Sequence, residues 1–372
     1  MQLKRIYVDN FRNLCREEIQ LNPGINIVLG KNAQGKTNFL EAVYILAAAN
    51  SPRTNIEQEM VAWKNDYYFV KGEVESQDDS FSISVGYTQG KKRIRVNESP
   101  LERVKDLLGR FIVIFFGPED LQLIKGSPQL RRQFLDREIS LIYPLYYENL
   151  QRYRTVLGQR NNLLKEIGEK GTGESQLEPW DEQLADSGGE LVSRRIRFLK
   201  ELREKINSKY TEISGENLEF KVEYEASLAL DKNSSSQDWK RAFIDALKRR
   251  RKEELIRGVT IIGPHRDDIS FQLGDRELKN YGSQGQQRTA VLALKIGELE
   301  FMAQVRGEQP VLLLDDVFSE LDGTRQKALL DLIGGNIQSI ITTTDNNFQE
   351  INKPCHYFTV DKGKINRWEG RI

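Results

Sequence analysis

A glycine-rich segment at residues 30–37 contains the residue types that bind phosphate. It fits the pattern GxxxxGK[ST], which ends in Lys36 and Thr37. Glycines let backbone N–H groups turn around phosphate oxygens, the lysine reaches the outer phosphates, and the threonine hydroxyl is a ligand for Mg²⁺. The pattern therefore predicts a site for a nucleoside triphosphate and Mg²⁺. Its candidate binding residues are Gly30, Lys31, Asn32, Ala33, Gln34, Gly35, Lys36 and Thr37.

Two adjacent carboxylates supply the second part of such a site. Asp315 and Asp316 follow the apolar run Val311–Leu314, which has the pattern of a buried strand. In a nucleotide site the first acid holds Mg²⁺ and the second positions the attacking water. Because consecutive side chains of a strand point to opposite faces, two different roles are expected. Lys36, Asp315 and Asp316 are candidate catalytic residues, and Thr37 and Asp315 are candidate metal ligands.

A third motif, Ser283-Gln284-Gly285-Gln286, precedes a predicted helix. A serine at this position is compatible with an ordinary helix N-cap. In its order relative to the other two motifs, the segment resembles the signature motif of the ATP-binding-cassette ATPases. Ser319–Asp322 likewise resembles the D-loop of that superfamily. The resemblance implies that Ser283, Gly285 and Gln286 act on ATP held by a second copy of the chain, in a head-to-tail homodimer.

Composition excludes several classes of protein. The chain has 372 residues, with 55 Lys and Arg against 55 Asp and Glu, so its formal net charge is zero. A uniformly cationic coat is excluded, but a local basic face is not. Two histidines and two cysteines are too few for a structural zinc site or a histidine-based mechanism. Without a signal peptide or an apolar run near about 20 residues, a cytoplasmic protein with no membrane partner is expected.

Hydropathy patterns predict an α/β fold interrupted by a helical lobe. Residues 1–128 and 258–372 alternate strands and helices, whereas 129–257 are mainly helical, with two antiparallel helices broken at 168–179. We expect these three segments to be two parts of one head and an inserted lobe. Strands are predicted at 3–8, 25–29, 67–74, 80–87, 91–96, 111–116, 218–225, 311–314 and 339–343, and helices at 37–49, 239–257, 286–306 and 324–333.

Five motifs together resemble the RecF family of bacterial recombination mediators. They are the opening residues 3–13 and the segments 117–121, 131–136, 263–268 and 314–322. The separation of 247 positions between Lys36 and Ser283 also exceeds what a transporter cassette would need. The resemblance implies a P-loop ABC/SMC-type ATPase head, a mixed sheet with flanking helices, without a long arm.

In that family, ATP drives dimerisation on DNA at gaps and single-/double-strand junctions, and slow hydrolysis releases it. RecR and RecO are partners in loading RecA. The resemblance implies the same role in DNA replication, recombination, repair and the SOS response, in the bacterial cytoplasm near the nucleoid. Asp316 stands where many relatives have Glu, and Ile341–Asp345 has no histidine at the switch position. We therefore expect weak ATP hydrolysis, and the resemblance implies that DNA stimulates it.

Two alternatives remain open at this point. One is a structural SMC-like chromosome ATPase, although the apolar stripe that ends at Ile213 is too short for a long coiled coil. The other is a cassette ATPase of a system that does not act on DNA.

Clusters of cations are candidates for contact with DNA phosphates. They are residues 91–95, residues 248–252, and Arg131, Arg132 and Arg137. Helix geometry lets only two or three of residues 248–252 share a face, and Arg249 and Lys252 are the candidates there. A solvated surface is the alternative for each cluster. Residues 265–268 are either a nucleotide-responsive contact or an internal salt-bridge cluster, and Tyr146, Tyr147 and Tyr153 are expected in the core.

Overall fold

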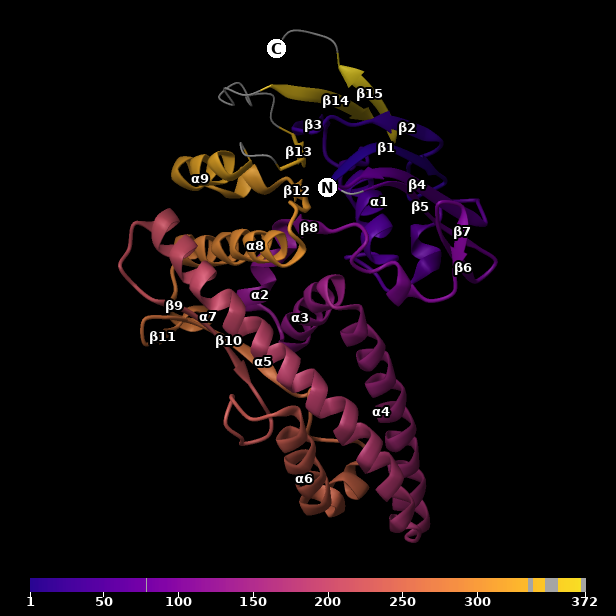
Figure 1. The fold of residues 1–372 in the computed structure, drawn as a ribbon, viewed down its shortest axis with the longest axis vertical. Helices are drawn as coiled ribbons and strands as arrows, with labels where there is room; N and C mark the ends of the chain where they lie inside the picture. Colours follow the sequence, from indigo (N-terminus) through magenta and orange to yellow (C-terminus); the bar gives the residue numbers. More distant parts are fainter. Residues whose placement is uncertain (78, 334–336, 345–353, 369–372) are drawn as a thin grey trace. The chain divides into compact units, whose positions relative to one another are not determined.

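The computed structural model describes residues 1–77, 79–333, 337–344 and 354–368. It divides into two compact units, whose elements are labelled in Figure 1. Unit 1 comprises Met1–Asp120, Glu212–Gly215 and the chain from Arg288, and unit 2 comprises Leu121–Thr211 and Glu216–Gln287. The sequence predicted boundaries at 128/129 and 257/258. Residues 258–287 instead group with unit 2, because a strand within them pairs with a strand of that unit.

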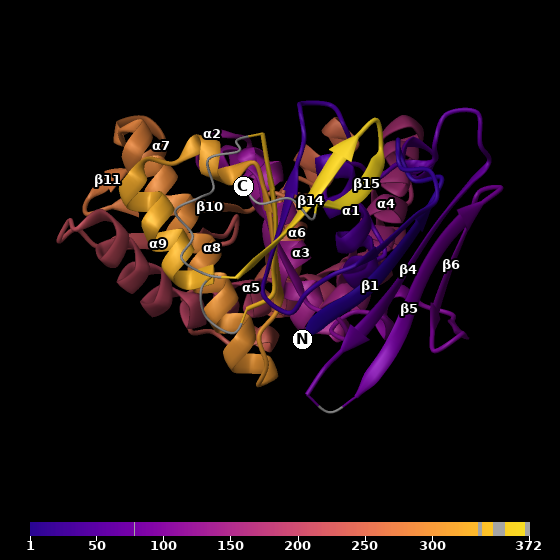
Figure 2. The same cartoon turned by 90° about the horizontal axis from the view of Figure 1, so that it is seen from above.

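The first sheet of unit 1 is antiparallel, with the strand order β2-β1-β4-β5-β6-β7. Its inner face is apolar because side chains alternate along each strand, as in β4, where Tyr68, Val70 and Val74 are buried. Figure 2 shows β1, β4, β5 and β6 of this sheet side by side. They are β1 (Gln2–Asp9), β2 (Glu17–Gln20), β4 (Tyr67–Glu75), β5 (Ser80–Thr88), β6 (Lys91–Val96) and β7 (Ser99–Leu101).

The second sheet of unit 1 has the order β15-β14-β3-β13-β12-β8 and is parallel except for β15. Its central strands are buried along their whole length, which explains their continuous apolar runs. In this sheet only β13 separates β3, which precedes the phosphate loop, from β12, which ends in the acidic pair. Because the strands are parallel, their carboxyl ends lie at the same edge. The strands are β3 (Ile25–Leu29), β8 (Val113–Phe116), β12 (Val311–Asp315), β13 (Ser339–Thr343), β14 (Cys355–Asp361) and β15 (Lys364–Trp368).

Helix α1 (Lys36–Ala48) contacts strands of both sheets of unit 1, and nearly all of its side chains are buried. It therefore lies in the core, and its N-terminus meets the edge where the parallel strands end. Other elements of this part of the chain are η1 (Glu57–Met60), η2 (Val104–Asp106), η3 (Pro118–Leu121), η5 (Val317–Glu320), α8 (Gln284–Arg306), which begins in unit 2, and α9 (Gly323–Ile333).

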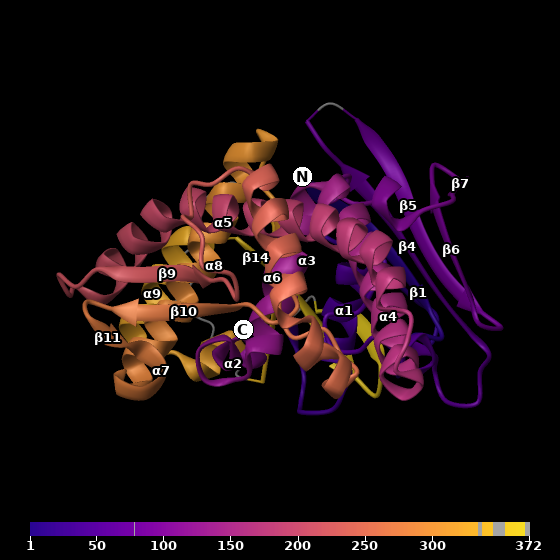
Figure 3. The same ribbon diagram turned by 90° about the horizontal axis from the view of Figure 1, so that it is seen from below.

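Unit 2 is built on long antiparallel helices and a small sheet of order β11-β10-β9 (Figure 3). Links Asn149–Ser187, Arg152–Asp186 and Arg160–Asp181 join α4 to α5 in antiparallel register. The elements are α2 (Gln122–Lys125), α3 (Pro128–Ile142), α4 (Pro144–Lys170), η4 (Glu174–Leu177), α5 (Glu178–Ser214), β9 (Phe220–Glu225), α6 (Ser236–Arg257), β10 (Asp268–Leu273), β11 (Arg276–Glu277) and α7 (Leu278–Tyr281).

The predicted strands and helices all occur, with ends that differ by a few residues. Six strands of the described residues were not predicted: β2, β7, β10, β11, β14 and β15. Each is at or next to a sheet edge, where half-exposed residues weaken the apolar signal. Tyr146 and Tyr153 are buried as expected, and Tyr147 is half-buried.

Candidate nucleotide-binding site

The phosphate loop connects β3 to α1, and two of its glycines are required by close contacts. Gly35 has φ +118°, and a Cβ atom there would lie 2.7 Å from Asn13 Oδ1. A Cβ atom on Gly30 would lie 2.6 Å from the carbonyl oxygen of Val360, on β14. The loop therefore follows a path that only glycine permits at these two positions.

The N-terminus of α1 offers its first backbone N–H groups to a ligand. Gly35 is the N-cap, and no side-chain cap hydrogen bond occupies this end among the described residues. The first N–H groups of a helix lack intrahelical acceptors and attract anions together with the helix dipole. A phosphate group fits the chemistry of this end.

Lys36 is 6% exposed, and within the part of the chain that the structure describes its hydrogen-bond partners belong to the loop itself. Its Nζ donates to the carbonyl oxygens of Gly30, at 2.7 Å, and Lys31, at 3.0 Å. Burial lowers the pKa of Lys36, while Asp316 and Asp315 act in the opposite direction. An anionic phosphate can replace these neutral carbonyls as partner of Lys36, because a hydrogen bond from the ammonium to an anion is stronger than one to a neutral carbonyl.

Thr37 and Asp315 meet although 278 residues separate them in the chain. Thr37 Oγ1 donates to Asp315 Oδ1 at 2.9 Å, and Thr342 Oγ1 donates to the same oxygen at 2.7 Å. A hydroxyl and a carboxylate are oxygen donors of the kind Mg²⁺ prefers when it also binds nucleotide phosphates. No group of three or more His, Cys, Asp or Glu side chains that could hold a metal occurs in the described ranges. The pair therefore fits an Mg²⁺ ion whose remaining ligands include oxygens of the bound nucleotide.

Asp316 lies immediately after β12 in the left-handed backbone region, at φ 50°. Its N–H approaches both the carbonyl oxygen and Oγ1 of Thr342, each at 3.1 Å, and its carbonyl accepts from Ser319 Oγ at 2.7 Å. A non-glycine residue rarely adopts this conformation, although aspartate is among the more tolerant types. The anchored turn separates the Asp316 side chain from the strand that carries Asp315.

The loop is also held by residues that sequence reasoning did not select. The carbonyl oxygen of Gln34 accepts from Asn13 Nδ2 and from the N–H of Gly363, both at 2.9 Å. Gln34 Oε1 accepts from the N–H of Lys362 at 2.7 Å. The sequence pointed to Asn13 through the opening motif, to which this residue belongs. No pattern in the sequence pointed to the turn between β14 and β15.

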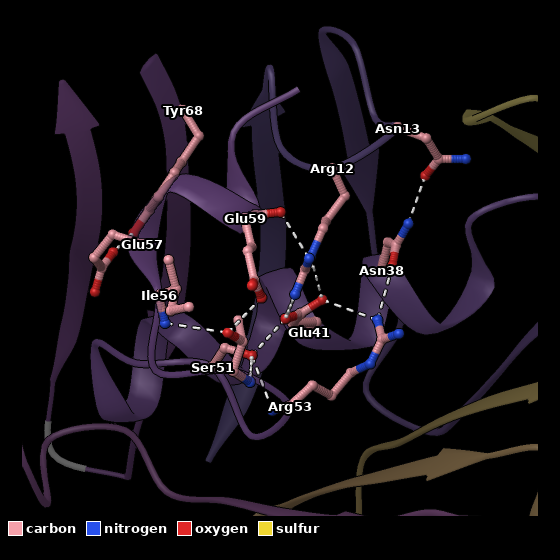
Figure 4. Close-up of polar contacts among 11 residues, drawn as sticks. Arg12, Asn13, Asn38, Glu41, Ser51, Arg53, Ile56, Glu57, Glu59 and Tyr68 are labelled. Carbon is pink, nitrogen blue, oxygen red and sulfur yellow. Dashed lines mark hydrogen bonds and ion pairs between the residues drawn. The ribbon is translucent and has the colours of Figure 1, made fainter. Parts of the chain in front are cut away.

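A buried carboxylate on α1 organises a second layer beneath the loop (Figure 4). Glu41 is completely buried and receives Nε and Nη2 of Arg12 at 3.0 and 2.7 Å. Ser51 Oγ, at 2.5 Å, and Arg53 Nη1, at 3.2 Å, also donate to Glu41. Asn38 continues the network, since its Oδ1 accepts from Arg53 at 3.0 Å and its Nδ2 donates to Asn13 at 2.8 Å. The chain around Ser51–Arg53 is thus linked to the residue that braces Gln34.

The third motif begins α8 within unit 2. Ser283 Oγ accepts from the N–H of Gln286 at 3.1 Å, and Gln286 Oε1 accepts from the N–H of Ser283 at 3.0 Å. This reciprocal arrangement is a capping box. Gln286 Nε2 also donates to Glu216 at 3.3 Å. Ser283 remains exposed, and Gly285 follows it in the first turn, so the N-cap role and a role toward a second subunit are compatible.

The segment 265–268 is part of a polar network inside unit 2. His265 Nδ1 pairs with Tyr153 Oη at 2.7 Å, and its Nε2 pairs with the carbonyl oxygen of Thr260 at 3.1 Å. Burial lowers the pKa of His265 to about 4. Burial also raises the pKa of Asp267, which accepts from Tyr224 Oη at 2.5 Å. These contacts match the internal alternative.

Three cations considered for DNA contact have partners within the same unit. Arg131 forms a bidentate pair with Asp268 at 2.7 and 2.8 Å, and Arg132 donates to the carbonyl oxygen of Asp267 at 2.6 Å. Arg137 pairs with Glu138 at 2.6 Å. Arg131 and Arg132 thus link α3 to the start of β10, whereas the pair of Arg137 stays within α3. Asp345, the last residue of the segment where many cassette ATPases carry a switch histidine, lies outside the described residues.

A family model described as "RecF/RecN/SMC N terminal domain" matches residues 2–366. The chain is 42% identical to the DNA replication and repair protein RecF of Halothermothrix orenii, over 99% of this chain and 100% of that protein. It is 40% identical to the RecF protein of Ligilactobacillus salivarius, over 98% and 97% of the two chains. The chain belongs to the RecF family.

Solved structures agree with this membership. A structure of the recombination mediator RecF with ATP, from the RecFOR pathway, has a TM-score of 0.92 and 37% identity, and covers 98% of this chain and 97% of that one. An SMC head bound to the C-terminal winged-helix domain of ScpA has a TM-score of 0.57 and 14% identity over 99% and 98% of the chains, which shows the shared fold. The expected ABC/SMC-type head fold and the RecF resemblance are confirmed. None of the described helices has the length and apolar character needed to cross a membrane.

Proposed function

We propose that this chain binds ATP with Mg²⁺ at the phosphate loop and couples that binding to the capture of DNA. The observation that carries the proposal is the hydrogen bond between Thr37 and Asp315, at the N-terminus of α1 and beside Lys36. It places a hydroxyl, a carboxylate and an ammonium around one helix end. Known relatives named for DNA replication and repair, and a RecF structure with ATP, support the same reading.

Each residue has a separate task in this proposal. Lys36 exchanges its two carbonyl partners for phosphate oxygens, and the N–H groups of residues 31–37 surround the phosphates. Thr37 and Asp315 hold Mg²⁺, which neutralises phosphate charge. Asp316 orients the attacking water. Its carboxylate is one methylene shorter than the glutamate of many cassette ATPases, which suits slow hydrolysis; stimulation by DNA is part of the proposal that ATP binding is coupled to DNA capture.

Ser283, Gly285 and Gln286 complete the nucleotide site of a second copy of the chain, so that dimerisation depends on ATP. The dimer holds duplex DNA and gapped or single-strand junctions until hydrolysis releases it. RecR and RecO are the proposed protein partners, with loading of RecA as the result, in the cytoplasm near the nucleoid.

The test is binding to a fluorescently labelled gapped duplex, with and without Mg·ATP, at two salt concentrations. Tight, salt-sensitive binding only with Mg·ATP is the expected result, and Lys36→Ala abolishes it. Equal binding with and without nucleotide, or normal ATP-dependent binding by Lys36→Ala, contradicts the proposal.

Two further variants separate the steps. Asp316→Asn keeps the dimer on DNA because ATP is bound but not hydrolysed. Ser283→Ala keeps ATP binding by the single chain but weakens dimerisation, measured by light scattering. An equal loss of ATP binding in Lys36→Ala and Ser283→Ala contradicts the role of Ser283 toward the second subunit.

A further inference from the structure

The five consecutive cations of α6, Lys248–Lys252, have different surroundings in the folded chain. Arg251 points inward, with a side-chain exposure of 16%, and its Nη2 donates to the buried Asp181 at 2.5 Å. Arg250 pairs with Glu253 at 3.1 Å. Lys248, Arg249 and Lys252 are exposed, and none of them has an ion pair or hydrogen bond within the part of the chain that the structure describes.

Helix geometry puts the three cations without partners on one face. Residues three or four positions apart are neighbours on a helix surface, so Lys248 and Arg249 both adjoin Lys252. Arg241, two turns earlier, lies on the same side and is 80% exposed. We call Arg241, Lys248, Arg249 and Lys252 the α6 cationic face. At about 1.5 Å per residue it is about 16 Å long.

The opposite side of α6 fixes this face to the body of unit 2. Trp239, Phe243 and Leu247 are buried there, and Glu254 is completely buried and paired with Arg160 at 2.7 Å. The cations are therefore displayed on an anchored helix. Changes to them remove charge without disturbing the packed side.

Exposed cations elsewhere in unit 2 commonly have acidic neighbours. Arg203 pairs with Glu219, Lys232 with Glu223, and Arg197 with Glu201. On the α6 cationic face Arg241 lies 4.0 Å from Asp238, and the exposed Asp245 lies among the four cations, so two acids accompany four cations. The face thus has an excess of positive charge, although the chain as a whole has a net charge of zero.

We propose that the α6 cationic face binds the sugar-phosphate backbone of duplex DNA, independently of base sequence. Lys and Arg side chains at this spacing neutralise phosphates along one stretch of backbone. The aromatic residues of α6, Trp239 and Phe243, are buried, so the face has no surface on which unpaired bases could stack. Duplex DNA is therefore the partner that the chemistry favours. The inference rests on the proposed DNA-binding function and assigns part of it to unit 2.

The experiment compares two double variants of the full chain that remove equal charge from the same helix. Arg249→Gln with Lys252→Gln removes two residues of the face. The matched control, Arg250→Gln with Arg257→Gln, removes two exposed arginines that both pair with Glu253. Binding to a plain duplex with Mg·ATP is measured by fluorescence anisotropy between about 50 and 200 mM salt.

Each lost phosphate contact makes the negative slope of log K against log salt less steep by about 0.9. When salt rises fourfold over this range, the affinity of the wild type and of the control falls. The fall for the face variant should be smaller by a factor of about ten. The reduction should be the same for duplexes of different sequence. ATP binding and thermal unfolding, measured in parallel, should match the wild type, because the altered side chains are exposed.

Three outcomes overturn the inference. The first is a wild-type slope in the face variant, which is expected if the face binds a protein. The second is an equal change in both double variants, which a general effect of net charge would produce. The third is a change that depends on base sequence. If the wild type itself does not bind DNA with Mg·ATP, the proposed function fails instead.

Discussion

Lys36 in unit 1 and Arg160 in unit 2 are both buried cations, but their partners differ in kind. Lys36 donates to two neutral backbone carbonyls of its own loop. Arg160 is completely buried and donates to Asp181, Glu254 and Thr260, each at 2.7 Å. Its two carboxylate partners come from different helices. The positive charge of Arg160 is therefore neutralised by carboxylates of its own unit, whereas Lys36 is hydrogen-bonded to neutral groups.

The difference indicates which polar residues serve a ligand and which serve the fold. A cation held by neutral, replaceable acceptors can be recruited by phosphate at little cost. A cation enclosed by carboxylates cannot be withdrawn without leaving buried charges unpaired, which is strongly destabilising. Arg195 follows the same rule, since it contacts Asp136, Tyr146, Tyr224 and the carbonyl oxygen of Pro264.

The largest expected effect is on stability, in unit 2. Arg160→Met leaves Asp181 and Glu254 buried beside an apolar side chain and should lower the free energy of unfolding by about 3–5 kcal/mol. Lys36→Ala should cost much less, because it removes only bonds to carbonyls. Urea unfolding followed by tryptophan fluorescence measures both, and Trp239, which is buried in unit 2, reports on that unit.

An exposed ion pair supplies the control for that experiment. Arg250→Gln removes the pair with Glu253 and should change the free energy of unfolding by no more than about 1 kcal/mol. If Lys36→Ala destabilised the chain as much as Arg160→Met, the distinction between ligand-directed and structural cations would be wrong.

The sequence was most informative where function depends on neighbouring residues. The phosphate loop, the acidic pair and the motif at Ser283 are short patterns whose residue types are dictated by phosphate and metal chemistry, so they could be located without a structure. Most strands and helices were also predicted, because their apolar periodicity is local. The fold class followed from the order of these elements and from the family resemblance.

Pairing between distant residues could not be predicted. Arg131 was a candidate for DNA contact, yet its partner Asp268 lies 137 positions away and only the fold brings them together. The extent of unit 2 depends on the pairing of β9 with β10, which no local pattern encodes. The β14–β15 turn braces Gln34 through the backbone N–H groups of Lys362 and Gly363, and backbone donors leave little trace in residue types.

A second, intermediate effect concerns pH and the network around His265. Burial lowers the pKa of His265 to about 4, below its ordinary value of 6.5. The unfolded chain therefore takes up a proton that the folded chain excludes, and stability falls as pH decreases from about 6.5 toward about 4. Between about pH 7.5 and pH 5 the wild type should lose about 2 kcal/mol through this group.

His265→Gln isolates that contribution. Urea unfolding of this variant should show a smaller loss of stability over the same pH range than the wild type, although it is less stable at neutral pH. The raised pKa of Asp267 acts in the opposite direction at the acidic end, and comparing the two chains cancels it. Identical pH profiles would show that His265 is accessible to protons in the folded unit, contrary to its buried contacts.

The smallest expected effect is on ATP affinity and tests whether the second layer of unit 1 supports the phosphate loop. Asn38→Ala removes the link from Arg53 to Asn13, and Asn13 in turn donates to Gln34. Because a single hydrogen bond contributes about 1 kcal/mol, the Kd for Mg·ATP should rise by up to about fivefold.

Two companion variants make this small change interpretable. Asn38→Asp keeps an oxygen for Arg53 but cannot donate to Asn13, so it should weaken ATP binding like Asn38→Ala if the contact to Asn13 matters. Asn149→Ala removes a hydrogen bond to Ser187 within unit 2 and should leave ATP affinity unchanged. Isothermal titration with Mg·ATP measures all three. Wild-type affinity in both Asn38 variants would mean that the loop keeps its shape through the β14–β15 turn and its own glycines, and that the Glu41 network serves only the packing of α1.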